Sequence, residues 1–416
     1  MKRLVRRYKH IKICTNPFKL VNNPYHLNVL WLVMTNKIFV IVCLILLTSC
    51  KQKDASDWTD EKTQKSNLLE NFTFSMDTLM VDTGDDLINF GIPFMGAVSA
   101  DVRHYHILNY KTLELQRINL DSLKLIDSYF FEKEGPNSPG FTITFQPLGN
   151  DRFFFPAFRE PAIIHQSGEK VRSWNLNPET IIEGLPVESA TVNNRIVFNP
   201  SLDQLYSLPF NYETRDYYLA VLDSAGERKA MMALPQFQKA HQFTIRTGGP
   251  EGGGLKIELP FLQHFDDRVL ISCTVGNGIY IYKPKLDSLF YREFPLSLVP
   301  LEKTEAVKNR VHSQQEFEEE IKKLATQISY WNFIRDEKSG RYFRFASRVL
   351  SHKTETTADE LEIFLMVFSE DLELIGETKI KGLSTLPKGG FFKDGKLWSH
   401  VNVADELGFA VMDLKF

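Results

Sequence analysis

Two histidines one residue apart are the clearest candidates for metal chemistry in this chain. His104 and His106 flank Tyr105 in an apolar run. Because side chains alternate along a strand, both imidazoles would project from one face, where Asp101 could supply a third ligand of a kind that zinc accepts. A polar strand facing a central channel would explain the pair equally well. The later histidines are scattered, so we predict no metal site and no cofactor, with His104 and His106 as the candidate ligands should a metal bind.

The motifs of common hydrolases are missing from the sequence. It has no Gly-x-Ser-x-Gly turn for a nucleophilic serine and no His-Glu-x-x-His helix for a catalytic zinc. The glycine-rich segment Thr247–Gly254 lacks the Gly-Lys-Ser/Thr ending of a phosphate-binding loop. We therefore predict no catalytic residue. Whether the protein is an enzyme stays open, and a non-enzymatic role is favoured.

A signal for lipid attachment ends the N-terminal apolar run. Ile38–Leu47 follows Lys37 and is closed by Thr48, Ser49 and Cys50. A bilayer-spanning helix needs roughly 20 apolar residues, whereas a signal peptide needs about 7–15. The small residue before Cys50 fits a lipobox, in which the thiol is acylated before cleavage; a hydrophobic N-terminus with a chance cysteine is the alternative. We predict an outer-membrane lipoprotein of the bacterial cell envelope, anchored through Cys50 and facing either the periplasm or the surface.

We predict that the signal region spans residues 1–49, and its charge differs from that of the rest of the chain. Residues 1–33 carry seven basic residues and no acidic one, so we expect the true start to be Met34. Residues 1–49 hold eight of the 49 lysines and arginines and none of the 52 acids, which leaves 41 basic and 52 acidic residues and a net charge of −11. An acidic chain repels phosphate backbones, so nucleic acid is excluded as a partner.

Only one cysteine remains in the predicted mature domain. Cys14 and Cys43 lie in the signal region and Cys50 is the lipid site, so Cys273 has no partner for an intramolecular disulfide. It lies in an apolar run, which predicts a buried small hydrophobic residue.

The rest of the chain divides into a tether and one β-rich domain. Residues 50–67 are charged and polar, which predicts a lipidated N-terminus followed by a flexible tether. In residues 68–416, short runs of Phe, Ile, Val, Leu and Tyr alternate with polar residues and turn residues, as in strands and hairpins. We predict a single all-β domain.

Five polar turns recur along this domain and predict a repeated unit. They are Leu120–Leu123, Gln166–Glu169, Leu222–Gly226, Leu286–Leu289 and Ser369–Leu372. Asp and Ser stabilise tight turns by bonding nearby backbone amides, and four-stranded units of roughly 40–50 residues are typical of propeller blades. We predict a six-bladed β-propeller with blades at 88–133, 141–179, 188–235, 256–297, 326–381 and 385–416. The strand Phe72–Met80 would pair with the last blade and close the ring. Seven blades, or a pair of two-sheet sandwiches, are the alternatives.

One segment breaks the β pattern. Glu302–Tyr330 is charged, with apolar residues three and four apart, which predicts an amphipathic helical insertion near 302–330. Ser313 and Glu316 form a capping box at the start of its second half. The helix would lie on the propeller rim, or alternatively act as a lid or a docking helix.

The lipobox, the β repeat and the turn Glu134–Gly140 together resemble a known family. The Gly-Pro-rich turn is similar to those of six-bladed propellers of the NHL and TolB-like type. The chain from about residue 70 to 416 resembles the uncharacterised propeller lipoproteins of the Bacteroidetes type, domain of unknown function 4221. The resemblance implies the propeller fold and no established catalytic residues.

These observations favour a lipid-anchored binding or scaffold module for a peptide, glycan or protein partner at the loop-rich face of the propeller. The side chains that could line a pocket there are Phe155, Phe158, Arg159, Tyr330, Trp331 and Trp398; core packing is their alternative role. A hydrolase or lyase acting on polysaccharide or peptide is the second hypothesis, favoured if carboxylates or the histidine pair converge in the central funnel. A structural subunit of an envelope complex is the third, favoured if the 302–330 helix exposes an apolar face. The sequence sets no oligomeric state.

Overall fold

The structure is a computed structural model that describes residues 67–86, 88, 95–157, 160–184, 190–191, 195–211, 214–248, 253–258, 260–352, 359–404 and 406–416. One compact unit spans Lys65–Phe416. The predicted signal region with Met34, the lipid site Cys50 and the candidates Phe158 and Arg159 lie outside the described residues. Within those ranges no helix is both long enough and apolar enough to cross a membrane.

The fold is all-β and propeller-like. The described residues form six four-stranded antiparallel sheets, here called sheets 1 to 6. Sheet 1 holds β2 (Gly96–Val98), β3 (His104–Asn109), β4 (Glu114–Asn119) and β5 (Lys124–Phe130). Sheet 2 holds β6 (Gln146–Gly149), β7 (Arg152–Phe155), β8 (Ala162–His165) and β9 (Lys170–Ser173). Sheet 3 holds β11 (Val197–Asn199), β12 (Gln204–Ser207), β14 (Tyr218–Leu222) and β15 (Arg228–Ala233).

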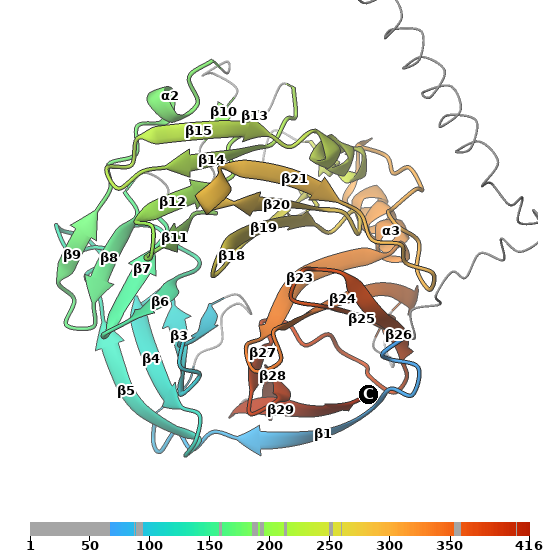
Figure 1. The fold of residues 1–416 in the computed structure, drawn as a ribbon, viewed down its shortest axis with the longest axis horizontal. Coiled ribbons are helices and arrows are strands. Elements are labelled where there is room, and N and C mark those ends of the chain that lie inside the picture. The colour runs from blue at the N-terminus through green and yellow to red at the C-terminus, as the bar shows by residue number, and fades with distance from the viewer. Residues whose placement is uncertain are drawn as a thin grey trace, which may run out of the picture. The chain divides into compact units, whose positions relative to one another are not determined.

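The later sheets follow the same order. Sheet 4 holds β18 (Pro260–Phe265), β19 (Arg268–Cys273), β20 (Ile279–Lys283) and β21 (Ser288–Arg292). Sheet 5 holds β23 (Ser329–Asp336), β24 (Arg341–Ser351), β25 (Glu360–Phe368) and β26 (Leu374–Ile380). Sheet 6 holds β27 (Phe391–Lys393), β28 (Lys396–Val403), β29 (Glu406–Lys415) and β1 (Thr73–Met80). Within the compact unit the sheets succeed one another around a common centre in chain order (Figure 1).

Minor elements fill the connections between sheets. β10 (Ala190–Thr191) pairs with β13 (Phe210–Asn211), and β16 (Ile245–Thr247) lies between β17 (Leu255–Lys256) and β22 (Arg310–Val311). The short helical elements are α2 (Pro178–Ile181), η1 (Pro235–Phe243) and η2 (Pro284–Leu286).

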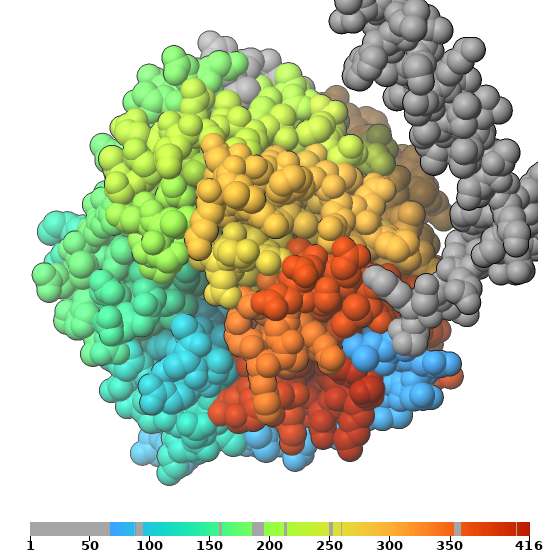
Figure 2. Space-filling view, viewed as in Figure 1, coloured from blue at the N-terminus to red at the C-terminus, as the bar shows by residue number. Residues whose placement is uncertain are grey.

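The N-terminal strand of the unit completes the last sheet. β1 pairs with β29 along its whole length, from Thr73 opposite Lys415 to Met80 opposite Gly408. In the space-filling view the blue N-terminal segment lies against the red C-terminal strands (Figure 2). Sheet 6 is therefore built from both ends of the described chain.

The five polar turns of the sequence all connect the third and fourth strands of sheets 1 to 5. Each contains one residue with a positive φ angle: Leu123, Gly168, Gly226, Asp287 and Leu372. Side-chain acceptors fix the turns, as where Asp223 Oδ1 accepts hydrogen bonds from the backbone N–H groups of Ala225 and Glu227. The repeated turn chemistry thus marks one structural position in each of sheets 1 to 5.

Apolar side chains pack between the sheets. One buried cluster lies between each pair of consecutive sheets from 1 to 6, and a sixth joins sheet 6 to sheet 1. In that sixth cluster Tyr105 of β3 meets Phe409 of β29 edge to face, with ring centroids 5.2 Å apart. Cys273 belongs to the cluster between sheets 3 and 4 and is 4% exposed, as predicted for a buried hydrophobic residue.

The predicted helix over 302–330 is too long. The observed helix α3 spans Gln314–Ala325, and its N-cap Ser313 accepts a hydrogen bond from the backbone N–H of Glu316 at 3.1 Å. The prediction failed on either side because apolar spacing alone cannot separate a helix from an extended segment whose side chains are buried. Val307 and Val311 are buried in such a segment, and the chain enters β23 at Ser329.

Candidate ligand-binding site

Because the strands of each sheet run antiparallel, their connections lie alternately at two opposite ends of the strands, which form two faces of the fold. The turns between first and second strands and between third and fourth strands lie at one face, here called the turn face. The links between second and third strands, and the connections from one sheet to the next, lie at the other, here called the loop face. A ligand site on either face must be built from these connections.

Ion pairs fasten neighbouring sheets at the turn face. Arg117 of sheet 1 contacts Asp151 of sheet 2 at 2.7 Å, and Arg172 of sheet 2 contacts Asp203 of sheet 3 at 2.5 Å. These four charged side chains hold neighbouring sheets together, so their role at the turn face is structural.

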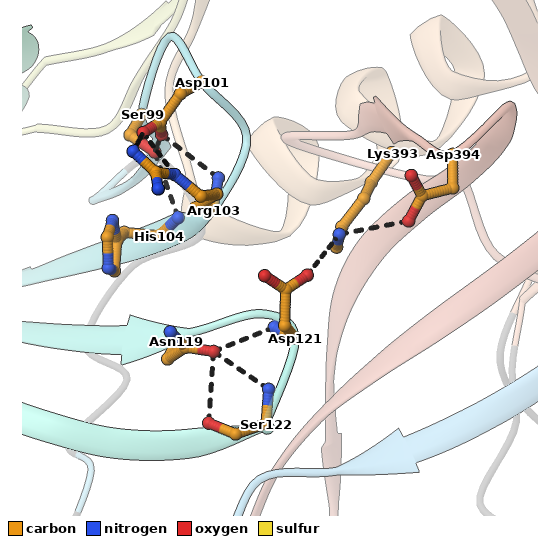
Figure 3. A network of polar contacts seen from close by, with 9 residues as sticks. All are labelled: Ser99, Asp101, Arg103, His104, Asn119, Asp121, Ser122, Lys393 and Asp394. Atoms are coloured by element: carbon orange, nitrogen blue, oxygen red, sulfur yellow. Dashed lines mark hydrogen bonds and ion pairs between the residues drawn. The ribbon is translucent and has the colours of Figure 1, made fainter.

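An ion pair also joins sheet 6 to sheet 1 at the turn face (Figure 3). Lys393 donates to Asp121 at 2.6 Å and to Asp394 at 3.0 Å. The Lys393 ammonium lowers the pKa of the Asp121 carboxyl, first through its hydrogen bond and then through its charge. Nearby, Asp101 accepts hydrogen bonds from Ser99 at 2.6 Å and from Arg103 at 2.7 Å.

The histidine pair also serves packing. His106 is 3% exposed, and its Nε2 lies 3.3 Å from the donating Nε of Arg117. Burial, followed by the charge of Arg117, lowers the pKa of His106 to about 3, which keeps the ring neutral. The rings of His104 and His106 lie 6.3 Å apart, and Asp101 is held by Ser99 and Arg103.

The described residues hold no cluster of three or more His, Cys, Asp or Glu side chains suited to a metal. His104 and His106 stay untested as metal ligands, while the observed contacts of His106 are those of a core residue.

A central cavity of about 520 Å³ is lined by the first strand of every sheet. Its walls include Val98, Gln146, Val197, Gln263, Asn332 and Phe391. The described lining contains no carboxylate and neither member of the histidine pair. The paired carboxylates of a glycosidase funnel are therefore not among its described lining residues.

Two glutamines of this cavity face the neighbouring sheet rather than the open space. Gln146 exchanges two hydrogen bonds with the backbone of Phe198, at 3.0 and 3.2 Å. Gln263 does the same with Phe333, at 2.8 and 2.9 Å. Their amides therefore join first strands to one another.

A second cavity, here called the α3 pocket, opens on the loop face. It has a volume of about 480 Å³ and lies between α3 and the loop-face ends of sheets 4 and 5, with the connection to sheet 6 along one side. Its volume falls in the range of about 300–1,000 Å³ that is usual for small-molecule sites. The polar lining residues are Lys256, Glu258, Thr274, Lys303, Ser329, Ser347, Arg348, Asp359, Thr385 and Lys388.

The most buried polar groups form one end of the α3 pocket. Glu258 and Lys303 are each 4% exposed. Thr274 donates a hydrogen bond to Glu258, and Lys303 Nζ donates to Ser329 Oγ at 2.7 Å. Burial lowers the pKa of Lys303, an effect that the charge of Glu258 opposes and the charge of Lys256 reinforces.

Backbone hydrogen bonds bring together the segments that carry Thr274, Lys303 and Ser329. The N–H of Lys303 donates to the carbonyl of Val275 at 2.8 Å, and the N–H of Tyr330 donates to the carbonyl of Thr274 at 3.0 Å. Residues that follow β19, β21 and α3 along the chain thereby meet at one place.

Apolar side chains also line the α3 pocket. Ile321, Leu324 and Ala325 come from α3, and Leu361 and Leu386 come from sheet 5 and the segment that follows it. The apolar face of α3 is thus turned inward, with Phe317 and Leu324 buried. The exposed apolar face expected of a docking helix is not seen on α3.

Of the described aromatic candidates, Trp331 is the one that lines the α3 pocket. Its Nε1 donates to Ser347 Oγ at 3.1 Å, and Lys388 Nζ lies 5.5 Å from the centre of its ring. Trp331 also lines a cavity of about 220 Å³ that shares residues with both larger cavities. By contrast, Phe155, Tyr330 and Trp398 are buried in the core.

Sequence reasoning missed Glu258, Lys303 and Ser329. Glu258 lies between sheets 3 and 4, Lys303 lies between sheets 4 and 5, and Ser329 is the first residue of β23. None of them belongs to a sequence motif. A lysine two residues after an apolar segment is typical of the protein surface, and the burial of Lys303 becomes evident only in the folded structure.

Comparisons with known proteins agree with this fold. The family model described as Domain of unknown function (DUF4221) matches residues 66–379. The crystal structure of a DUF4221 family member from Bacteroides vulgatus is similar with a TM-score of 0.59 and 15% identity, over 83% of this chain and 98% of that one. No curated protein matches this sequence.

Two further solved structures show weaker similarity. A protein of Bacteroides fragilis, described as a candidate exported protein, has a TM-score of 0.47 and 10% identity over 82% of this chain and 96% of its own. The WD40 domain of Neurospora crassa Pan2 has a TM-score of 0.39 and 10% identity over 77% of this chain and 88% of its own.

Proposed function

The chain belongs to the DUF4221 family, and from that premise we propose that it is a lipid-anchored binding module of the bacterial cell envelope, with its ligand site in the α3 pocket. The observation that carries the proposal is a cavity of small-molecule size whose lining combines two buried charged residues with apolar side chains.

The architecture in this proposal is a closed propeller of six blades, one for each four-stranded sheet. Buried clusters between all consecutive sheets, including sheets 6 and 1, support it. So does the pairing of β1 with β29, which would leave no free edge in the last blade. A closed ring gives the connections of the loop face a rigid base.

The anchor in this proposal is a lipid on Cys50, placed by the lipobox that precedes it. The polar segment 50–67 would hold the domain away from an outer membrane, on its periplasmic or its outer side. The chain after residue 49 has a net charge of −11 and cannot act as a polybasic membrane anchor. The acyl chains on Cys50 would therefore hold the protein at the membrane by themselves.

The binding function is tested with a pocket-filling variant of the native lipoprotein in phospholipid nanodiscs. Ala325 lines the pocket from α3, so Ala325→Trp should fill the cavity, whereas Gln315→Trp adds the same ring to an exposed part of the helix. The probes are short apolar peptides, neutral and acidic disaccharides and short fatty acids. We expect saturable binding of at least one probe class, lost in Ala325→Trp and kept in Gln315→Trp. Binding that survives Ala325→Trp, or no binding by any class, contradicts the proposal.

A hydrolase is the second candidate, and one contact favours it. Lys303 Nζ lies 2.7 Å from Ser329 Oγ, within the range of a base and its nucleophile, and burial lowers the pKa of Lys303. A serine–lysine hydrolase would be labelled at Ser329 by a fluorophosphonate and lose the label in Lys303→Met. An unlabelled wild-type protein removes this candidate.

A further inference from the structure

We infer that the α3 pocket takes an amphipathic carboxylate, with the carboxylate held by Lys303 and an aliphatic body against α3. The inference rests on the proposed binding function and names the chemistry of its ligand. A short fatty acid and a peptide ending in a hydrophobic residue share this chemistry.

Among the residues that the structure describes, no carboxylate forms an ion pair with the buried ammonium of Lys303. Lys303 is 4% exposed, and in the described structure its Nζ makes one hydrogen bond, to the neutral oxygen of Ser329. An ammonium has three donors, and a buried charge is costly unless it is paired. Glu258 is near enough to act on the charge of Lys303, yet it forms no ion pair with Lys303 and accepts a hydrogen bond from Thr274 instead.

The charges around the cavity favour an anion. Its lining contains four basic residues, Lys256, Lys303, Arg348 and Lys388, and two acidic residues, Glu258 and Asp359. Arg348 forms an ion pair with Glu362 outside the lining, so three basic residues remain against two acidic ones. Lys256 lies close enough to Lys303 to lower its pKa, so two like charges act on the same end of the pocket. A basic cavity in a chain with a net charge of −3 is a local reversal of sign.

The walls favour an aliphatic body over a sugar. Ile321, Leu324, Leu361 and Leu386 present hydrocarbon to the cavity. A sugar would need an open aromatic face and free hydrogen-bond donors. Lys388 lies over the ring of Trp331, and the indole N–H is bonded to Ser347.

The carboxylate is tested by matched probes on the native lipoprotein in nanodiscs, with empty nanodiscs as the blank. Hexanoate is compared with 1-hexanol by calorimetric titration at pH 7, and Leu-Leu is compared with its C-terminal amide. We expect hexanoate or Leu-Leu to bind about ten-fold or more tightly than its uncharged partner, because hydrogen bonds between charged groups are the strong ones. Binding of hexanoate alone would identify a fatty acid, and binding of Leu-Leu alone would identify a peptide end.

A variant assigns the effect to one residue. Lys303→Met should reduce carboxylate binding about ten-fold or more, while Lys322→Met, on the exposed side of α3, should leave it unchanged. The wild-type comparison stands even if Lys303→Met fails to fold. Equal binding of hexanoate and 1-hexanol, together with equal binding of Leu-Leu and its amide, overturns the inference. If a neutral disaccharide then binds and Ala325→Trp abolishes it, the proposed function survives without the inference; if no probe binds, both fail.

Discussion

The side-chain amide of Gln263 pairs with both backbone groups of Phe333. Its Nε2 donates to the carbonyl oxygen at 2.8 Å, and its Oε1 accepts from the N–H at 2.9 Å. The two residues belong to the first strands of sheets 4 and 5, and Gln146 makes the equivalent contact with Phe198 between sheets 2 and 3. The Gln263 side chain thus replaces the hydrogen bonds that a neighbouring strand would make inside a sheet. It satisfies the N–H and C=O of Phe333, which face the centre.

Removing that amide should weaken the fold. We expect Gln263→Leu to lower the free energy of unfolding by about 2 kcal/mol, because it leaves the N–H and C=O of Phe333 without partners. Urea titration of the native lipoprotein measures the change. The exposed Gln315→Leu is the control and should cost less than about 0.5 kcal/mol. Equal values for the two variants would show that water replaces the amide.

Acid should destabilise the protein through His106. Its pKa is about 3 in the fold and 6.5 as a free side chain, so the folded state binds fewer protons between these values. Stability is therefore lost as pH falls from about 6.5, by about 2 kcal/mol at pH 5. The groups acting on His106 are Arg117, His104 and Asp151.

We expect the His106→Gln variant to lose less stability than wild type between pH 7 and pH 5, as measured by urea unfolding at each pH. His312→Gln, at an exposed position, should follow wild type. Parallel pH curves for wild type and His106→Gln would contradict a neutral, buried imidazole.

Thiol counting tests both Cys273 and the N-terminus. Burial raises the pKa of the Cys273 thiol to about 11, so it should not react with a disulfide reagent in the folded protein at pH 8. After unfolding, one thiol per chain should react if residues 1–49 are removed and Cys50 is acylated. Two or more reactive thiols would contradict that processing, and a reaction in the folded state would contradict the burial.

The wall of the α3 pocket depends on a helix cap. Ser313 accepts a hydrogen bond from the N–H of Glu316, and the Glu316 carboxylate accepts from the N–H of His312 at 2.9 Å. We expect Ser313→Ala to lower the free energy of unfolding by about 1 kcal/mol. Ser384→Ala, at an exposed position, is the matched control. No difference between them in urea titration would mean that packing alone holds α3.

Local patterns carried most of the fold. The first five predicted segments, such as 88–133 and 326–381, each contain the four strands of one sheet, and 385–416 contains three strands of sheet 6. Turn residues and alternating apolar runs predict such strands because both signals are encoded within a few residues. The capping box likewise placed the start of α3 at Ser313. The segment 302–313 was misread because its buried valines keep a helical spacing by coincidence.

The α3 pocket could not be predicted from local patterns in the sequence. Glu258, Thr274, Lys303 and Ser329 meet only after three connections fold together, and no pair of them is close in sequence. The pairing of Gln263 with Phe333 spans 70 residues for the same reason. By contrast, His104 and His106 were candidates because of their spacing in the sequence. In the structure His106 is a buried core residue.

Photo-crosslinking can locate the ligand site within the fold. A diazirine-bearing short fatty acid would be activated on the native lipoprotein in nanodiscs, and the labelled peptides mapped by mass spectrometry. We expect labels on Ile321, Leu324 or Leu386 that excess hexanoate removes and that are absent in Ala325→Trp. If hexanoate instead removes labels from Phe261 or Val197 in the central cavity, the ligand site does not lie in the α3 pocket.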